Sequence, residues 1–361
     1  MIEYENLHNF NKEFFEEFQK SFSETLKSGW FILGNNVKEF EEAFSKYCSV
    51  NHCIGVASGL DALFLSLKAC DFETGSEVIV PSNTYIATIL SIFNAGLKPV
   101  LAEPDIRTYN LDPEKIEECI SEKTKAIMPV HLYGKLSDMQ SIMTIAKKHN
   151  LVVIEDCAQA HGAAFNSVKA GAFGTFGAFS FYPTKNLGAL GDGGAVVVND
   201  ETNALSLRRL RNYGSDVKYY NEIAGFNSRL DEVQAAFLNI KLKKLDRINE
   251  HKRRLAAVYS ERLKSDFIKP HPDPAYTDVF HIYAVRHPKR DQLKKYLLDK
   301  GIKTEVHYPV PPYQQHAFRE FFDKKRFPVA DEIHSTILSL PVSYFHTEDD
   351  VAHVAEVMNK F

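Results

Sequence analysis

The chain has 361 residues, of which 44% are apolar and 25% are charged, and its formal net charge is −4. This length predicts two domains, and the composition is that of an ordinary soluble protein. The negative charge argues against nucleic acid or an anionic membrane as the main partner. Five cysteines, an odd number without zinc-ligand spacing, predict a cytoplasmic location and no metal site. The long uncharged run 78–97 is broken by proline, serine and asparagine, so it does not predict a membrane span.

The first half of the chain has the pattern of an α/β protein. Amphipathic spacing predicts helices over 11–27 and 37–47, the first with a phenylalanine at every fourth position from Phe14 to Phe22. From residue 52 onward, short apolar runs alternate with helical patterns. The predicted strands are 53–57, 77–80, 98–102, 125–130, 151–155, 177–181 and 195–198, and the predicted helices between the first five are 60–69, 87–94, 113–120 and 137–150. This alternation predicts a mainly parallel sheet covered by helices on both faces, which binds ligands at the carboxyl ends of its strands.

Polar residues follow several of these strands. Ser58–Asp61 opens a helix, whose free N–H groups and dipole favour an anion, although an ordinary N-cap serine is an equal alternative. Glu155 and Asp156 stand at the end of a later strand, an arrangement common in catalytic and cofactor sites and also found in solvated loops. Ser180, near the end of the next strand, is placed to join Ser58 and Gly59 around one anion.

The stretch 178–198 contains one lysine, Lys185, between two apolar runs. The turn at residues 191–194, Gly-Asp-Gly-Gly, predicts a hairpin between these runs. A lysine held between buried strands is costly to charge, which lowers its pKa and suits it to forming a Schiff base. The alternative is a lysine whose amine extends to solvent.

The second half of the chain is less regular. Residues 208–225 predict a basic, aromatic loop, which is either a solvated loop or a surface for an anionic substrate that contains a ring. Ser228 and Asp231 predict a capping box for a helix that continues into 241–254. We divide the chain into a large domain, 1–249, and a small α+β domain, 250–361. In the small domain we expect a strand at 279–285, helices at 291–300 and 348–360, and a chemically interesting point at His307-Tyr308-Pro309.

A Schiff-base lysine, a carboxylate for a ring nitrogen and a phosphate cradle are what pyridoxal phosphate (PLP) requires, and Lys185, Asp156 and the Ser58–Gly59–Ser180 site offer them. The chain resembles the sugar aminotransferases of the DegT/DnrJ/EryC1/StrS family over essentially its whole length. The segments that carry this resemblance are Gly-Trp-Phe-Ile-Leu-Gly at 29–34, Ser-Gly-Leu-Asp-Ala-Leu at 58–63, Pro-Ser-Asn-Thr-Tyr at 81–85, Glu-Asp-Cys-Ala-Gln-Ala-His-Gly at 155–162, the lysine stretch, and Gly-Phe-Asn-Ser-Arg at 225–229.

The resemblance implies the aspartate aminotransferase type of α/β fold (fold type I) and a homodimer with active sites at the subunit interface. It implies that Lys185 holds the cofactor and acts as general acid and base. Asp156 would pair with the pyridinium nitrogen, Gln159 would contact the phenolic oxygen and Tyr85 would stack on the ring. The phosphate would be held by Ser58, Gly59, Leu60 and Ser180, with Asn227 reaching over from the other subunit.

Tyr182 is a further catalytic candidate, expected to orient the sugar or to assist the proton shift. Because the substrate carries two negative phosphates, we expect cations in its site, and Lys218 and His307 are the candidates. Tyr219 and His161 are the other residues expected to contact the substrate. Tyr182, the Gly-Asp-Gly-Gly turn and the stretch 131–134 are similar to the 3-aminotransferases that act on dTDP-6-deoxyhex-3-uloses. A lysine at 185 argues against the dehydratase branch, which has a histidine there. The implied reaction moves the amino group of L-glutamate to the 3-keto group of such a sugar. A 4-aminotransferase and a PLP-binding regulatory protein without turnover are the alternatives.

Overall fold

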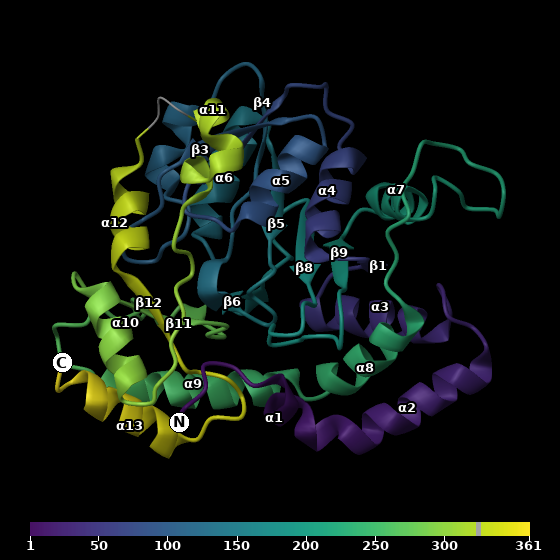
Figure 1. Ribbon diagram of the computed structural model, residues 1–361. Helices are drawn as coiled ribbons and strands as arrows, with labels where there is room; N and C mark the ends of the chain where they lie inside the picture. Colours follow the sequence, from purple (N-terminus) through teal and green to yellow (C-terminus); the bar gives the residue numbers. More distant parts are fainter. Residues whose placement is uncertain (323–325) are drawn as a thin grey trace.

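The computed structural model describes residues 1–322 and 326–361. At its centre lies a seven-stranded sheet with the order β1-β9-β8-β5-β4-β2-β3 (Figure 1). Within this sheet β9 pairs antiparallel with both of its neighbours, and the other pairings are parallel. The strands are β1 (His52–Val56), β2 (Glu77–Pro81), β3 (Lys98–Ala102), β4 (Thr124–Ile127), β5 (Val152–Asp156), β8 (Phe176–Ser180) and β9 (Gly194–Val198). The predicted mainly parallel sheet is confirmed.

Helices cover both faces of this sheet because the strand residues are apolar on both sides. Along β2, Ile79 packs into one core cluster, whereas Val78 and Val80 pack into the other. The helices of this half are α1 (Leu7–Asn11), α2 (Phe15–Ser28), α3 (Asn35–Cys48), α4 (Gly59–Ala69), α5 (Ile86–Asn94), α6 (Met139–His149), α7 (Glu201–Arg211) and α8 (Glu232–Leu242). Short strands β6 (Ala164–Phe165), β7 (Val168–Lys169) and β10 (Tyr276–Thr277) form a separate small sheet.

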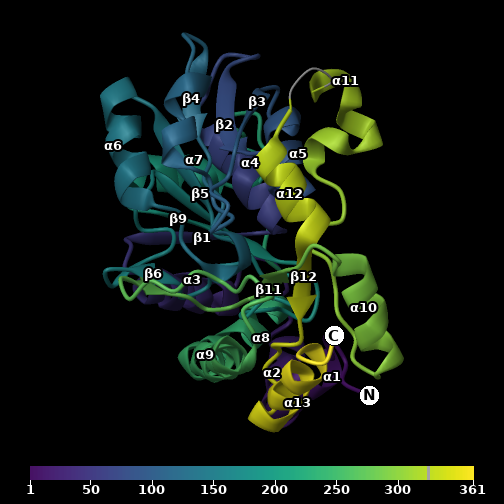
Figure 2. The same cartoon turned by 90° about the vertical axis from the view of Figure 1, so that its left-hand side faces the viewer.

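The C-terminal part has a core of its own, around the antiparallel pair β11 (Tyr283–Arg286) and β12 (Ile337–Leu340). It contains α9 (Leu245–Arg262), α10 (Arg290–Asp299) and α13 (Glu348–Met358), and both chain termini lie beside these elements (Figure 2). Two further helices, α11 (Arg319–Phe322) and α12 (Pro328–Thr336), extend back to the large sheet, where Phe322 and Phe327 join its core. Since α9 also runs through positions 249 and 250, the proposed domain boundary stays a prediction.

Several local predictions were wrong. The stretch 113–120 forms two short 3₁₀ turns instead of one helix, and Arg208–Arg211 end α7 instead of opening a loop. The capping box is absent because Ser228 Oγ donates to Asp61 and accepts from Ala57 N–H. The helix begins only at Glu232, and it breaks at Lys243 and Lys244, between α8 and α9.

Other elements differ mainly in extent. The predicted strand 279–285 begins only at Tyr283. The antiparallel neighbours β8 and β9 are joined by residues 181–193, a longer connection than the predicted tight hairpin. No helix in the described part of the chain combines the length and the apolar character that crossing a membrane requires.

Candidate active site

A cavity of about 510 Å³ opens at the carboxyl edge of the large sheet, where the parallel strands predict a ligand site. Most of the predicted site residues line it, and they come from the ends of β1, β2, β5 and β8 and from the C-terminal part of the chain. Those on the wall are Ser58, Gly59, Leu60, Tyr85, Asp156, Gln159, Ser180, Tyr182, Lys185 and His307. The sheet therefore brings together side chains that lie far apart in the chain, at the carboxyl edge where the sequence predicts the ligand site.

One end of the cavity is built for an anion. Ser58 is the N-cap of α4, and its Oγ accepts a hydrogen bond from Asp61 N–H at 3.1 Å. The N–H groups of Gly59 and Leu60, in the first turn, have no acceptor within the helix and carry its positive dipole end. A Cβ at Gly59 would lie 2.4 Å from the Cβ of Ser180. Glycine is therefore required for β8 to approach this helix terminus so closely.

Lys185 and Asp156 are the charged pair of the cavity. Burial lowers the pKa of the Lys185 amine to about 8, and the nearby Asp156 charge offsets only part of that effect. The Asp156 carboxylate is 5% exposed and accepts hydrogen bonds from Thr88 Oγ1 at 2.9 Å and from Ala158 N–H at 3.1 Å. Burial raises its pKa more than these contacts lower it. Both groups are therefore held where charge is costly unless a bound partner compensates it.

Glu155 serves a different purpose from its neighbour Asp156, because successive residues of a strand face opposite sides. Its carboxylate is fully buried and accepts backbone N–H groups of the loop that precedes β8, at Gly171, Phe173 and Gly174. His131 Nε2 lies 2.9 Å from Glu155 Oε2. Glu155 therefore anchors the loop behind β5, and Asp156 is the carboxylate that faces the cavity.

Tyr308, which stands in the stretch 307–309 that the sequence pointed to but was assigned no role in the site, connects several predicted site residues. Gln159 donates from Nε2 to the Tyr308 hydroxyl at 2.9 Å and accepts from Tyr133 N–H at 2.7 Å. The rings of Tyr85 and Tyr308 lie 5.0 Å apart, with an interplanar angle of 34°. The adjacent His307 shares a hydrogen bond of 2.8 Å with Ser339 Oγ, and burial lowers the pKa of its imidazole to about 4. An aromatic, uncharged wall therefore faces the charged pair.

Four predicted residues lie away from the wall of this cavity. His161 is fully buried behind it, between the rings of Phe179 and Phe181, and burial lowers its pKa to about 3. Lys218 and Tyr219 lie in the exposed connection between α7 and α8, with the Lys218 Nζ 4.9 Å from the Tyr219 ring centroid. Asn227 is also exposed. Their predicted contacts with cofactor or substrate stay predictions.

Sequence reasoning also missed His281, which lines the cavity with its Nε2 3.5 Å from Lys185 Nζ. It is one of 14 histidines and stands in no motif that predicts chemistry. Only the fold could have shown it, because the residues before β11 pack against the connection 181–193 that carries Lys185, here called the lysine loop.

An amine and a carboxylate in one cavity, beside an anion-binding helix terminus at the edge of a parallel sheet, form the kind of site found in transaminases. The family model for the DegT/DnrJ/EryC1/StrS aminotransferase family matches residues 12–359. The chain belongs to this family, as the sequence motifs indicated.

Relatives and solved structures support this membership. The chain is 51% identical to dTDP-3-amino-3,6-dideoxy-alpha-D-galactopyranose transaminase of Aneurinibacillus thermoaerophilus, over 100% of the chain and 99% of that protein. It is 42% identical to a "pleiotropic regulatory protein" of Geobacillus stearothermophilus, over 96% of the chain and 94% of that protein. The crystal structure of DesV from S. venezuelae in complex with a ketimine intermediate aligns with a TM-score of 0.97 at 40% identity, covering 99% of this chain and 98% of that one. The predicted fold type is thereby confirmed.

Proposed function

We propose that this chain is a PLP-dependent transaminase that moves the amino group of L-glutamate to the 3-keto group of a dTDP-6-deoxyhex-3-ulose. The observation that carries the proposal is the donor set of the cavity, where Lys185, Asp156 and the terminus of α4 meet. The 51% identity to a transaminase named for a dTDP-3-amino-3,6-dideoxygalactose supports the substrate class. The galacto or gluco configuration is left open.

The residues present fit PLP. The glycine at position 59 leaves room for phosphate oxygens at the α4 terminus, and Gly59, Leu60 and Ser180 would hold them. Asp156 would face the ring nitrogen, where a positive charge would relieve the cost of burying this carboxylate. Tyr85 and Gln159 would contact the ring and its phenolic oxygen. When bound, the cofactor supplies an electron-withdrawing ring that stabilises negative charge at the reacting carbon.

The chain's own residues would supply the proton chemistry. The lowered pKa of Lys185, about 8, makes a neutral amine available near physiological pH, so its Nζ can take a proton from one carbon and return it to another. Tyr182, on the same wall, would orient the sugar or assist this proton shift, and His307 would contact the nucleotide sugar. Their aromatic neighbours Tyr85 and Tyr308 would limit the access of water to the reacting atoms.

We further propose a homodimer with shared sites, in which Asn227 completes the phosphate site of the partner and Lys218 and Tyr219 contact its nucleotide sugar. A continuous stretch at 30–32 and the connection between α7 and α8 expose large apolar side chains, which supports an interface there. Those exposed by more than half are Trp30, Phe31, Val217, Tyr219 and Tyr220.

A reducing, cytoplasmic location is supported by the thiols of Cys48, Cys53 and Cys157, which are buried and unbridged.

One experiment tests the reaction and its regiochemistry together. The purified protein, PLP and L-glutamate are incubated with dTDP-6-deoxyhex-3-ulose or with the corresponding 4-ulose, and NMR locates the new amine. Formation of a 3-amino-3,6-dideoxyhexose still joined to dTDP supports the proposal, whereas a 4-amino product indicates a 4-aminotransferase. Release of 2-oxoglutarate with neither sugar would overturn the sugar assignment. No turnover with cofactor bound would favour the regulatory alternative, to which the relative from Geobacillus stearothermophilus points.

A further inference from the structure

His281 has one of its two ring nitrogens within hydrogen-bonding distance of the Lys185 amine. Its Nε2 lies 3.5 Å from Lys185 Nζ, whereas its Nδ1 is buried and has no hydrogen-bond partner among the described residues. A buried imidazole nitrogen without a partner is costly, so the ring is held in place by something other than its own hydrogen bonds. The backbone around it shows what holds it.

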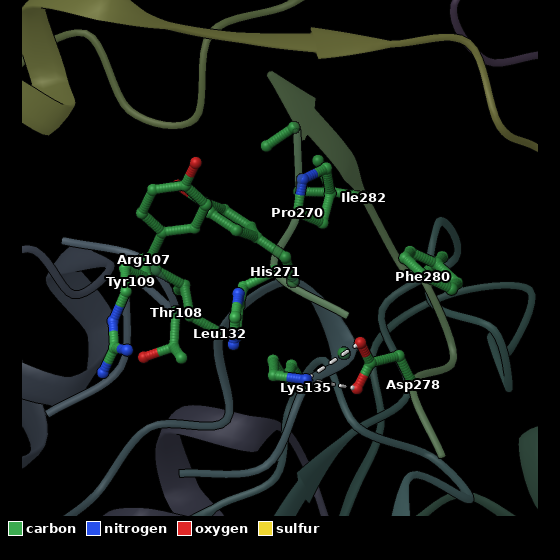
Figure 3. A pocket seen from close by; sticks show the side chains of 13 residues that line it. Arg107, Thr108, Tyr109, Leu132, Lys135, Pro270, His271, Asp278, Phe280 and Ile282 are labelled. Carbon is green, nitrogen blue, oxygen red and sulfur yellow. Dashed lines mark hydrogen bonds and ion pairs between the residues drawn. The ribbon is translucent and has the colours of Figure 1, made fainter. Parts of the chain in front are cut away.

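The segment that carries His281, residues 278–282, is fastened to residues 133–135, which follow β4. Figure 3 shows Asp278 paired with Lys135, at 3.2 Å between Lys135 Nζ and Asp278 Oδ2. The backbone N–H of Val279 donates to Gly134 at 2.9 Å, and that of Ile282 donates to Tyr133 at 3.3 Å. Gly134 has a φ of +98°, and a Cβ there would lie 2.9 Å from the backbone nitrogen of His281. The segment therefore sits tightly against 133–135.

The same segment is also tied to the lysine loop and to α9. Asn186, the residue after Lys185, donates from Nδ2 to the carbonyl of Val279 at 2.9 Å. Lys252, which is 2% exposed, donates from Nζ to the carbonyl of His281 at 3.2 Å. Asn186 therefore ties the backbone beside Lys185 to the backbone two residues before His281, which holds the two side chains within reach of each other.

The charges around His281 determine whether its imidazole can take a proton from Lys185. The groups whose charges act on the imidazole are Lys185, Lys252, His161 and His307, all neutral or positive, whereas the Asp156 charge acts on Lys185. Burial, reinforced by these charges, holds the pKa of His281 well below its usual range, while the pKa of Lys185 is about 8. Transfer of a proton from the ammonium to the imidazole is therefore unfavourable, but a hydrogen bond between them is not.

We propose that His281 is a positioning residue for Lys185: its Nε2 accepts a hydrogen bond from the Lys185 amine and fixes the direction of that amine whenever it is free of the cofactor. This role rests on the proposed function of Lys185 as the cofactor lysine. The segment 278–282 then has the role of holding His281 beside Lys185, which neither the sequence motifs nor the extent of β11 indicate.

The first test measures the Lys185 amine in the full chain freed of cofactor. Trace acetylation with acetic anhydride across a pH series, followed by peptide mass spectrometry, gives the pKa of Lys185 in the wild type, His281→Leu and His281→Gln. Loss of the acceptor removes a contact that favours the ammonium, so His281→Leu should lower this pKa further and His281→Gln should bring it back. A pKa that is unchanged, or that rises toward that of an ordinary lysine because water enters, overturns the proposal.

The second test uses the loaded enzyme. His281→Leu should lower the rate of the glutamate half-reaction by about tenfold, with partial recovery in His281→Gln and an unchanged KM for the nucleotide sugar. Equal loss in both variants, or a change confined to KM, contradicts a positioning role. His346→Gln is the matched control, because His346 is also buried but contacts Glu3 and Ser343 in the C-terminal part. Because acetylation needs neither cofactor nor substrate, it tests the contact between His281 and Lys185 even if the chain proves not to be a transaminase.

Discussion

At Lys185, burial and a neighbouring carboxylate act in opposite directions, and burial is the larger effect. Because burial disfavours the ammonium, the neutral amine forms near pH 8 instead of near the ordinary value for lysine. We therefore expect the rate of the glutamate half-reaction, followed by stopped-flow absorbance, to rise from pH 6.5 to about 8 and then level off. Lys185→Ala should abolish turnover and the visible Schiff-base band while leaving the fold intact, as judged by circular dichroism, because PLP can still bind at its phosphate site. Turnover near the wild-type rate in that variant would remove Lys185 from the mechanism.

Asp156 is expected to act through its charge and not as a proton carrier. Asp156→Asn keeps the shape and the contacts with Thr88 and Ala158 but removes the counter-charge for the ring nitrogen. The loss of one charge-assisted contact in a water-excluded site should lower kcat by about a thousandfold. Steady-state kinetics with saturating PLP measures this effect. The matched control is Glu155→Gln, which should mainly lower the melting temperature, because Glu155 binds the loop at 171–174.

These residue roles could be predicted unequally from the sequence. Lys185, Asp156 and Ser58 stand within a few residues of the ends of apolar runs, so the rule for strand ends places them at one edge. Tyr308 and His281 come from the C-terminal part and reach the cavity only through the packing of that part on the large sheet. No spacing in the chain encodes that approach. His161 belongs to a motif of the family, yet its ring turns into the core between Phe179 and Phe181.

At the scale of elements, one buried carboxylate fixes two helices to each other. Glu232, in the first turn of α8, accepts hydrogen bonds from the N–H groups of Gly34, Asn36 and Val37 at the start of α3. It is 2% exposed, so its removal leaves buried donors without an acceptor. We expect Glu232→Ala to lower the free energy of unfolding by about 3 kcal/mol, measured by urea denaturation. Glu39→Ala, on an exposed position of α3, should change it by less than about 0.5 kcal/mol.

Helices and strands were predictable where the apolar pattern was strong, and they were missed where tertiary contacts override it. The strands β2, β3 and β9 lie close to their predicted positions because their residues are apolar on both faces. Ser228 has the spacing of a capping residue, but Asp61 and the backbone of Ala57 engage its hydroxyl instead. The strand expected from 279 begins late, because residues 278–282 bond to Lys135, Gly134 and Tyr133 instead of to a neighbouring strand.

At the scale of the whole molecule, the exposed position of Asn227, away from the cavity of its own chain, leads to the last prediction. Lys185→Ala and Asn227→Ala chains are each expected to have lowered activity. If Asn227 serves the partner's site, a mixed dimer has one site with both lesions and one with neither. Random mixing of equal amounts makes about half of the dimers mixed, so activity should recover to about one quarter of the wild-type value.

Native mass spectrometry measures the fraction of mixed dimers, and the coupled assay for 2-oxoglutarate measures the recovered activity. The control mixes two differently tagged preparations of Lys185→Ala. It shows whether the mixing procedure alone raises the activity. If Asn227 acted within its own chain, each site of the mixed dimer would carry one lesion, and activity would not exceed the mean of the parents. Recovery that follows the measured fraction of mixed dimers, and halves when that fraction is halved, can arise only from a site that both chains build.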